Sequence, residues 1–120
     1  MRVAISTDGV DLNADVDPRF GRARNFILVE TATMKHQVIE NTQSLQLSQG
    51  AGIQAAQNVL QHYPEAVLTG NCGPKAFQVL QAAKVKVVVG VKGKISDVLQ
   101  EFIDGKYTPA ANANVEGHWM

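Results

Sequence analysis

Ala66-Val67-Leu68-Thr69-Gly70-Asn71-Cys72-Gly73-Pro74-Lys75 runs from an apolar segment into a turn rich in glycine. Residues 76–80 continue with helical spacing, and Pro74 suits the first turn of a helix. The stretch therefore predicts a strand, a tight turn and a helix in succession. Such a turn directs backbone N–H groups and the positive end of the helix towards one place, which favours an anion. Cys72 adds a soft sulfur donor, which extends the candidate ligands to anions that contain a metal.

Apolar patterning on both sides of this stretch predicts the remaining elements. Strands are expected over residues 2–6, 25–30, 36–40, 66–69 and 85–89. Helices are expected over residues 50–63 and 73–83, and a third begins at Ile95 and ends near Gly105. The third has the clearest amphipathic pattern, with apolar residues at helical spacing: Ile95, Val98, Leu99, Phe102 and Ile103.

The order of these elements predicts the fold class. Strands 25–30 and 36–40 are close enough in sequence to form an antiparallel hairpin. Helices separate the later strands, which favours parallel, right-handed crossovers. We expect an α/β fold: a ribonuclease-H-like three-layer sandwich, with a mixed five-stranded sheet in the order 3-2-1-4-5, an antiparallel second strand and helices on both faces. Residues 1–107 are expected to form this domain, and residues 108–120, with little periodicity, a flexible C-terminal tail.

Composition limits the kind of ligand that the protein can bind. The 120 residues include 11 basic and 11 acidic side chains, so we expect no general binding to nucleic acid or to a membrane surface. No apolar run approaches the ~20 residues of a membrane span. The single cysteine excludes an internal disulfide and fits the reducing cytoplasm, where we expect the protein to act. Because the basic and acidic side chains balance over the whole chain, any charged binding site must be formed by a local group of residues.

The predicted topology gathers four loops at one edge of the sheet, and ligands prefer the point where connections diverge from such an edge. The loops comprise residues 7–24, 41–49, 70–73 and 90–94. Several residues in or beside them could bind an anion: Arg19, Arg22, Arg24, Gly50, Gly52, Gly73 and Lys75. Each group also has a structural interpretation. The arginines could form a solvated cluster, Gly50-Ala51-Gly52 could allow close helix–sheet packing, and Cys72 could be a small buried thiol.

The sequence lacks the residue patterns that three common kinds of site need: nucleophilic catalysis, zinc binding and nucleotide binding by a phosphate-binding loop. Cys72 lacks an obvious base, because the histidines lie in a strand, at a helix end and in the tail: His36, His62 and His118. One cysteine with scattered histidines shows no zinc-ligand spacing. The Gly70–Lys75 turn lacks the glycine interval and the Lys-Ser/Thr ending of a phosphate-binding P-loop.

A nuclease hypothesis begins with Asp8, which follows the first strand. Two-metal chemistry needs several converging carboxylates. The predicted helix 50–63 contains no acidic residue, and the fourth strand ends in Thr69-Gly70-Asn71. The simpler interpretation of the four acidic residues in the first loop is that they form solvated turns: Asp8, Asp11, Asp15 and Asp17.

Taken together, these residues give a chain that resembles the dinitrogenase iron–molybdenum cofactor-binding family, from Met1 to about Tyr107. The resemblance rests on four motifs in order: Val3-Ala4-Ile5-Ser6-Thr7-Asp8, Asp17-Pro18-Arg19-Phe20-Gly21-Arg22, Gly50-Ala51-Gly52-Ile53 and Gly70-Asn71-Cys72-Gly73-Pro74-Lys75-Ala76-Phe77. It implies a ribonuclease-H-like fold and a protein that binds or carries an anionic metal–sulfur cluster. Most members have no established enzymatic activity, so we expect that this protein is not an enzyme. Within the family the chain looks most like members that hold a mixed molybdenum–copper sulfide cluster.

The resemblance also implies a set of cofactor-binding residues: Arg19, Phe20, Gly21, Arg22, Arg24, Gln49, Gly50, Ala51, Gly52, Gly70, Asn71, Cys72, Gly73 and Lys75. Guanidinium groups and backbone N–H donors can hold the sulfides by charge-assisted contacts, with Cys72 as an optional soft contact to the metal. Many relatives carry a histidine where this chain has Gln49. That difference favours a non-covalent cradle, and His118 in the tail is a much weaker candidate ligand.

Two other functions remain open at this point. The same loop edge could bind a partner protein, which would make the chain a regulatory or scaffold module. Partner proteins of a cluster-assembly or regulatory complex are also compatible with cluster binding. A divergent nuclease-like enzyme is the weakest alternative, because the carboxylates that it needs are missing.

Overall fold

Five strands form one mixed sheet in the computed structural model, which describes residues 1–115. They are β1 (Arg2–Thr7), β2 (Asn25–Glu30), β3 (Lys35–Glu40), β4 (Ala66–Leu68) and β5 (Lys86–Val88). Their spatial order is β3-β2-β1-β4-β5. β2 is antiparallel to both of its neighbours, whereas β4 is parallel to β1 and β5. This confirms the predicted α/β class, strand order and strand directions. The narrower ribonuclease-H-like classification stays a prediction.

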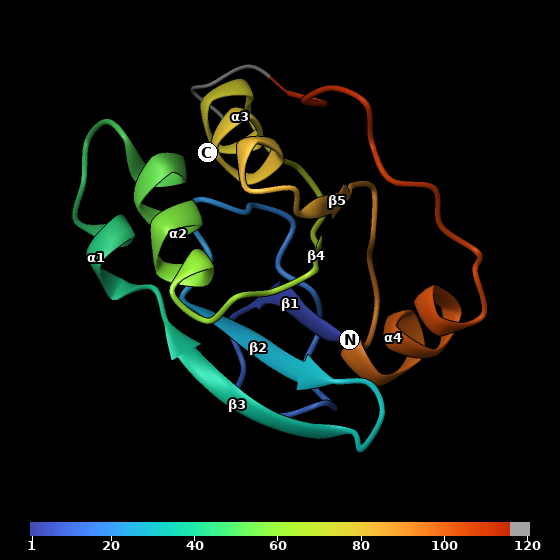
Figure 1. Cartoon of the computed structure of the whole chain (residues 1–120). Coiled ribbons are helices and arrows are strands. Elements are labelled where there is room, and N and C mark those ends of the chain that lie inside the picture. The colour runs from blue at the N-terminus through green and yellow to red at the C-terminus, as the bar shows by residue number, and fades with distance from the viewer. Residues whose placement is uncertain (116–120) are drawn as a thin grey trace.

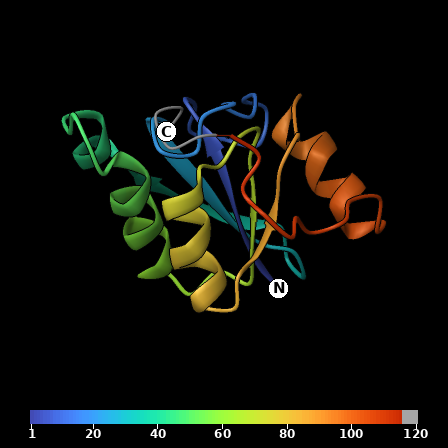
Figure 2. The same cartoon turned by 90° about the horizontal axis from the view of Figure 1, so that it is seen from above.

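Helices cover both faces of this sheet, as predicted (Figures 1 and 2). On one face lie α1 (Thr42–Leu45), α2 (Ala51–Leu60) and α3 (Pro74–Ala82), and on the other lies α4 (Ile95–Ile103). The sheet is thus the middle of three layers. None of the helices within residues 1–115 is both long enough and apolar enough to cross a membrane.

Side chains that alternate along the central strands supply two separate cores. In β1, Val3 and Ile5 join the core beneath α4, whereas Ala4 joins the core beneath α2 and α3. This alternation follows from the period of two residues in a strand. β3 is an edge strand, and only Ile39 of its six residues is buried. The central strands β1, β2 and β4 are almost entirely buried, and the loops extend from their ends.

The segment after β3 differs from the prediction, because the polar loop 41–49 contains the four-residue helix α1. Buried Asn41 holds this helix: its side-chain oxygen accepts hydrogen bonds from Ser44 Oγ (2.9 Å) and from Asn58 Nδ2 (2.8 Å). Its Nδ2 donates to the Ala23 carbonyl at 2.8 Å. These partners come from three parts of the chain, so no local apolar pattern could reveal the helix. The next helix, predicted to reach Tyr63, ends at Leu60.

The C-terminal segment runs from α4 around the β5 edge of the sheet to α3 (Figure 1). Tyr107 packs against the core beneath α4, and Ala110 and Ala113 pack against the opposite core. The Ala110 N–H donates to the Val87 carbonyl at 2.7 Å, so the segment covers the free edge of β5. The expected flexibility of residues 108–120 stays a prediction, but residues up to 115 make specific contacts. His118 lies outside the described residues.

Candidate functional site

The carboxyl ends of β1, β3, β4 and β5 point to one edge of the sheet, and the predicted loops meet there. The loop between β1 and β2, residues 8–24, contains Arg19, Arg22 and Arg24 and is called the arginine loop below. Direct hydrogen bonds join it to the turn after β4. The Asn71 N–H donates to the Pro18 carbonyl at 2.7 Å, and the Phe20 N–H donates to the Asn71 carbonyl at 3.1 Å. The Gly90 N–H also donates to the Gly70 carbonyl at 2.8 Å. The structure therefore brings together segments about 50 residues apart in sequence.

Gly70 is required by this close approach. A Cβ atom at position 70 would lie 2.7 Å from the Cα atom of Pro18 and 2.8 Å from its carbonyl oxygen. These are backbone atoms, which cannot move aside as the end of a flexible side chain can. The two loops can lie at this distance only because position 70 has no side chain.

The three predicted arginines have different environments. Arg19 is 53% exposed and lies with its Nε 4.0 Å from the Asp17 carboxylate. Arg24 is also exposed. Arg22 is half-buried, and its Nη1 donates to the Leu47 carbonyl at 2.7 Å and to the Ser44 carbonyl at 3.3 Å. Arg22 thus binds the carbonyl groups at the end of α1, whereas Arg19 and Arg24 present their side chains to solvent.

Three buried polar residues that the sequence did not indicate as binding residues hold the arginine loop in place: Ser6, Asp17 and Thr69. Asp17 is buried, and its Oδ1 accepts a hydrogen bond from the Arg19 backbone N–H at 2.8 Å. Burial raises the pKa of Asp17 above its ordinary value of 3.8, and the nearby Asp8 raises this pKa further. Ser6 donates to the Asp17 carbonyl at 2.7 Å and lies 2.7 Å from the Thr69 hydroxyl. Thr69 precedes Gly70, so this buried pair connects the two loops.

Cys72 lies in the turn after β4 and is fully buried. Its thiol donates to the Gly73 carbonyl at 3.7 Å. Burial raises the pKa of this thiol to about 12, so it is protonated at neutral pH. The Cys72 N–H is also engaged, because it donates to Asn114 Oδ1 at 2.8 Å. In this conformation Cys72 is the small buried thiol that the structural interpretation predicted.

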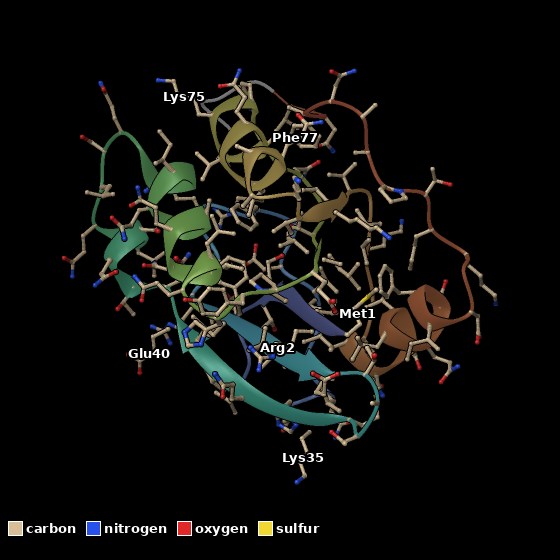
Figure 3. All side chains as sticks on the ribbon, in the orientation of Figure 1. Met1, Arg2, Lys35, Glu40, Lys75 and Phe77 are labelled. Atoms are coloured by element: carbon tan, nitrogen blue, oxygen red, sulfur yellow. The ribbon has the colours of Figure 1, made fainter. Side chains whose placement is uncertain are left out.

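The first turns of α2 and α3 supply the remaining predicted positions. Gly50 adopts φ 79° as the N-cap of α2, and within residues 1–115 no side chain caps either helix. Gln49 and Gly50 are exposed, whereas Ala51 and Gly52 are buried. Lys75 is exposed and extends from the first turn of α3 into solvent (Figure 3). The start of α2 and the exposed Lys75 thus bring backbone N–H groups and one cation to the loop edge.

Two of the predicted positions lie in the interior. Phe20 is fully buried, and its ring centroid lies 5.1 Å from that of Phe26. Gly21 is buried beside it. Phe20 therefore anchors the arginine loop in the core beneath α2 and α3. Arg19, directly before it, carries an exposed guanidinium group, and Arg22, two positions after it, carries a half-buried one.

The described part of the chain lacks a group of side chains that could ligate a metal ion directly. Within residues 1–115, no three histidine, cysteine, aspartate or glutamate side chains group closely enough to hold a metal ion. The chemistry available at the loop edge is instead that of exposed cations and backbone N–H groups. Such donors suit an anion that brings its own metal and ligands.

Comparison with known proteins agrees with this arrangement. A family model described as dinitrogenase iron–molybdenum cofactor matches residues 1–105. The chain belongs to this family. The expectation drawn from the four sequence motifs is thus confirmed, and the match includes the arginine loop, the start of α2 and the turn at Cys72.

Two solved structures and one further relative are similar to this chain over most of its length. The apo form of the orange protein from Desulfovibrio gigas is 44% identical, with a TM-score of 0.93 over 95% of this chain and 96% of its own. A putative NifB protein from Thermotoga is 32% identical, with a TM-score of 0.81 over 97% of this chain and 98% of its own. An uncharacterized protein of Methanocaldococcus jannaschii is 28% identical over 88% of both chains. The orange protein belongs to the subgroup that the sequence resembles most.

Proposed function

We propose that this protein binds or carries an anionic, molybdenum-containing metal–sulfur cluster, held without covalent ligation. The observation that carries the proposal is the hydrogen-bonded contact between the arginine loop and the Gly70–Cys72 turn at the carboxyl edge of the sheet. Membership of a family described by the dinitrogenase iron–molybdenum cofactor supports the class of ligand. Similarity to the apo form of the orange protein supports a protein that exists with and without a bound group.

The donor set fits a cluster that arrives with its own sulfides. Arg19, Arg24 and Lys75 are exposed cations around the loop edge. Guanidinium groups are weakly hydrated and donate several N–H groups in a plane, so they can contact two sulfides of one anion. The uncapped N-terminus of α2 adds backbone donors and a favourable dipole. Together these groups neutralise charge without entering the coordination sphere of the metal.

Arg22 has a different role in this proposal. Its guanidinium holds the carbonyl groups of Ser44 and Leu47, so it positions the segment that leads into α2. Removing it would disturb the site through the backbone. A binding test therefore needs to vary Arg19 and Arg24 and leave Arg22 in place.

A mixed molybdenum–copper sulfide is the composition we favour, because the chain resembles the orange-protein subgroup most. Copper inside such a cluster is soft and prefers sulfur. Cys72 is not prepared to ligate it in this conformation, since its thiol is buried and its pKa is raised to about 12. The cluster's own sulfides would supply the sulfur ligands, and Cys72 would remain an optional contact.

Reconstitution tests this function. Apo protein is mixed with tetrathiomolybdate and a copper salt, desalted, and analysed by visible absorption and by metal and sulfide content. The Arg19→Ala, Arg24→Ala double variant should retain at least about tenfold less cluster, because two charge-assisted contacts are lost. The matched control is Lys35→Ala with Lys86→Ala, which removes the same charge from the first residues of β3 and β5, at the opposite edge of the sheet.

Two results would contradict the proposal. One is a wild-type protein that assembles no coloured species and retains no molybdenum. The other is equal retention by the arginine double variant and the lysine control, which would show that the cluster binds elsewhere or adheres without specificity.

A further inference from the structure

The C-terminal segment 108–115 lies directly against the candidate site. Asn114 makes four hydrogen bonds with the Gly70–Cys72 turn. Its side-chain Oδ1 accepts from the Cys72 N–H at 2.8 Å, and its Nδ2 donates to the Gly70 carbonyl at 3.2 Å and to Asn71 Oδ1 at 3.1 Å. Its backbone N–H donates to the Cys72 carbonyl at 3.2 Å. Four polar groups of the turn are thus hydrogen-bonded to the chain's own tail.

We propose that residues 108–115 are a lid over the candidate site, and that Asn114 Oδ1 holds the place of a bound anion's acceptor atom at the Cys72 N–H. The identity of the anion rests on the proposed function. The lid itself does not, because it follows from contacts within this chain. A ligand that uses the Cys72 N–H must first displace Asn114, so the tail and the ligand compete.

The way in which the segment is attached is suited to opening. Asn114 is one anchor, and the hydrogen bond from the Ala110 N–H to the Val87 carbonyl is the other. Most side chains in the segment are exposed, and the half-buried ones are Val115 and the small Ala110 and Ala113, of which the two alanines pack against the core beneath α2 and α3. Opening therefore uncovers little apolar surface, which is the property of a segment with low local stability. The sheet and helices beneath it can stay folded.

Opening would change the chemistry of the turn at two atoms. The Cys72 N–H would lose its acceptor and become available to an anion. Ala110 and Ala113 pack against the core that contains Cys72, so their withdrawal would also give the thiol access to water, which favours its ionised form. Both changes make Cys72 a reporter of the lid, and the thiol can be followed in the apo protein without any cluster.

The test compares two asparagines of the same segment in the full-length chain. Asn114→Ala removes three side-chain hydrogen bonds, whereas the control Asn112→Ala alters an exposed residue two positions away. Alkylation of Cys72 by iodoacetamide at pH 8 should be at least about tenfold faster in Asn114→Ala than in wild type or control. Hydrogen exchange of the Cys72 amide, measured by NMR, should accelerate in parallel. Unchanged far-UV circular dichroism shows that each variant is folded.

Ala110→Pro provides a second and independent variant, because proline removes the N–H that reaches Val87. It should also accelerate alkylation. If neither variant reacts faster than Asn112→Ala, the tail does not close the turn and the lid proposal is overturned.

Cluster uptake tests the competition and separates it from the proposed function. With tetrathiomolybdate and copper, Asn114→Ala should load faster or bind more tightly than wild type. Uptake that is unchanged or weaker, with faster alkylation, would overturn the competition and make Asn114 part of the site's frame. If neither the wild type nor any variant takes up the cluster, the proposed function fails. The alkylation and exchange rates would still decide whether the lid exists.

Discussion

At the scale of single residues, the candidate site divides into groups that build it and groups that are free to bind. Asp17, Phe20 and Arg22 are turned inward, and their partners are the backbone and the core. Arg19 and Arg24 are exposed beside them. Buried residues in such a loop fix where the exposed ones can reach, so substitutions in the two groups should have different consequences.

Gly70 offers the sharpest test of the site's construction. Gly70→Ala places a methyl group 2.7 Å from the Pro18 Cα atom, so the two loops must separate. We expect the free energy of unfolding to fall by about 2 kcal/mol, as for other overpacked positions, and the urea midpoint measures this.

Gly90→Ala is the matched control for that substitution. Within residues 1–115, and apart from its two neighbours in the chain, no atom lies within 4 Å of a Cβ at position 90, and its φ of +74° carries a left-handed cost of about 1 kcal/mol. Equal losses in Gly70→Ala and Gly90→Ala would show that the contact between the loops is not restrictive.

At the scale of elements, α1 depends on a buried polar network and not on its own sequence. The helix has only four residues, and within the described chain no side chain caps it. Asn41 joins it to α2 through Asn58 and to the arginine loop through the Ala23 carbonyl. Since Arg22 holds the end of α1, the segment that enters α2 is fixed from two sides. The position of the α2 N-terminus thus follows from this network.

Asn41→Ala should therefore be much more harmful than its polar character suggests. It leaves the Ser44 hydroxyl, the Asn58 amide and the Ala23 carbonyl without their described partner, at a cost of about 3 kcal/mol in unfolding free energy. Gln43→Ala, at an exposed position of the same helix, should change it by less than about 0.5 kcal/mol. Urea unfolding compares them, and similar losses would contradict a structural role for the network.

At the scale of the whole molecule, the site-bearing loop is anchored in the main core. Phe20 leaves the loop, packs against Phe26 of β2 and joins the core that α2 and α3 cover. The tail crosses from the α4 side to this core and closes over the Cys72 turn. Both loops of the candidate site are therefore tied to the same core.

Phe20→Ala tests this anchoring. A cavity in the place of a fully buried ring should lower the free energy of unfolding by about 3–5 kcal/mol, and the midpoint of urea unfolding should fall accordingly. Phe20→Leu keeps most of the apolar volume and should cost no more than about 1.5 kcal/mol. A Phe20→Ala protein as stable as wild type would contradict the anchoring role and leave Phe20 only the cofactor-binding role that the family resemblance implied.

The α/β class, the strand order and the edge at which the loops meet could all be predicted from the amino-acid sequence. This was possible because strand and helix periodicity, and the handedness of crossovers, act through local patterning and chain geometry. The motifs around Arg19, Gly50 and Cys72 also sufficed to indicate the family, which the match over residues 1–105 confirmed.

Which of the predicted site residues face inward became clear from the folded chain and not from its sequence. The same residue type at three nearby positions gave no sign of different roles for Arg19, Arg22 and Arg24. Their roles differ because, of the three, only Arg22 donates to the carbonyl groups at the end of α1. The helix α1 and the position of Asn114 were equally hidden. Each depends on hydrogen bonds between residues far apart in the chain, 42 positions for Cys72 and Asn114. Local sequence carries no record of such partners, because the free energy that places them comes from contacts that exist only in the folded chain.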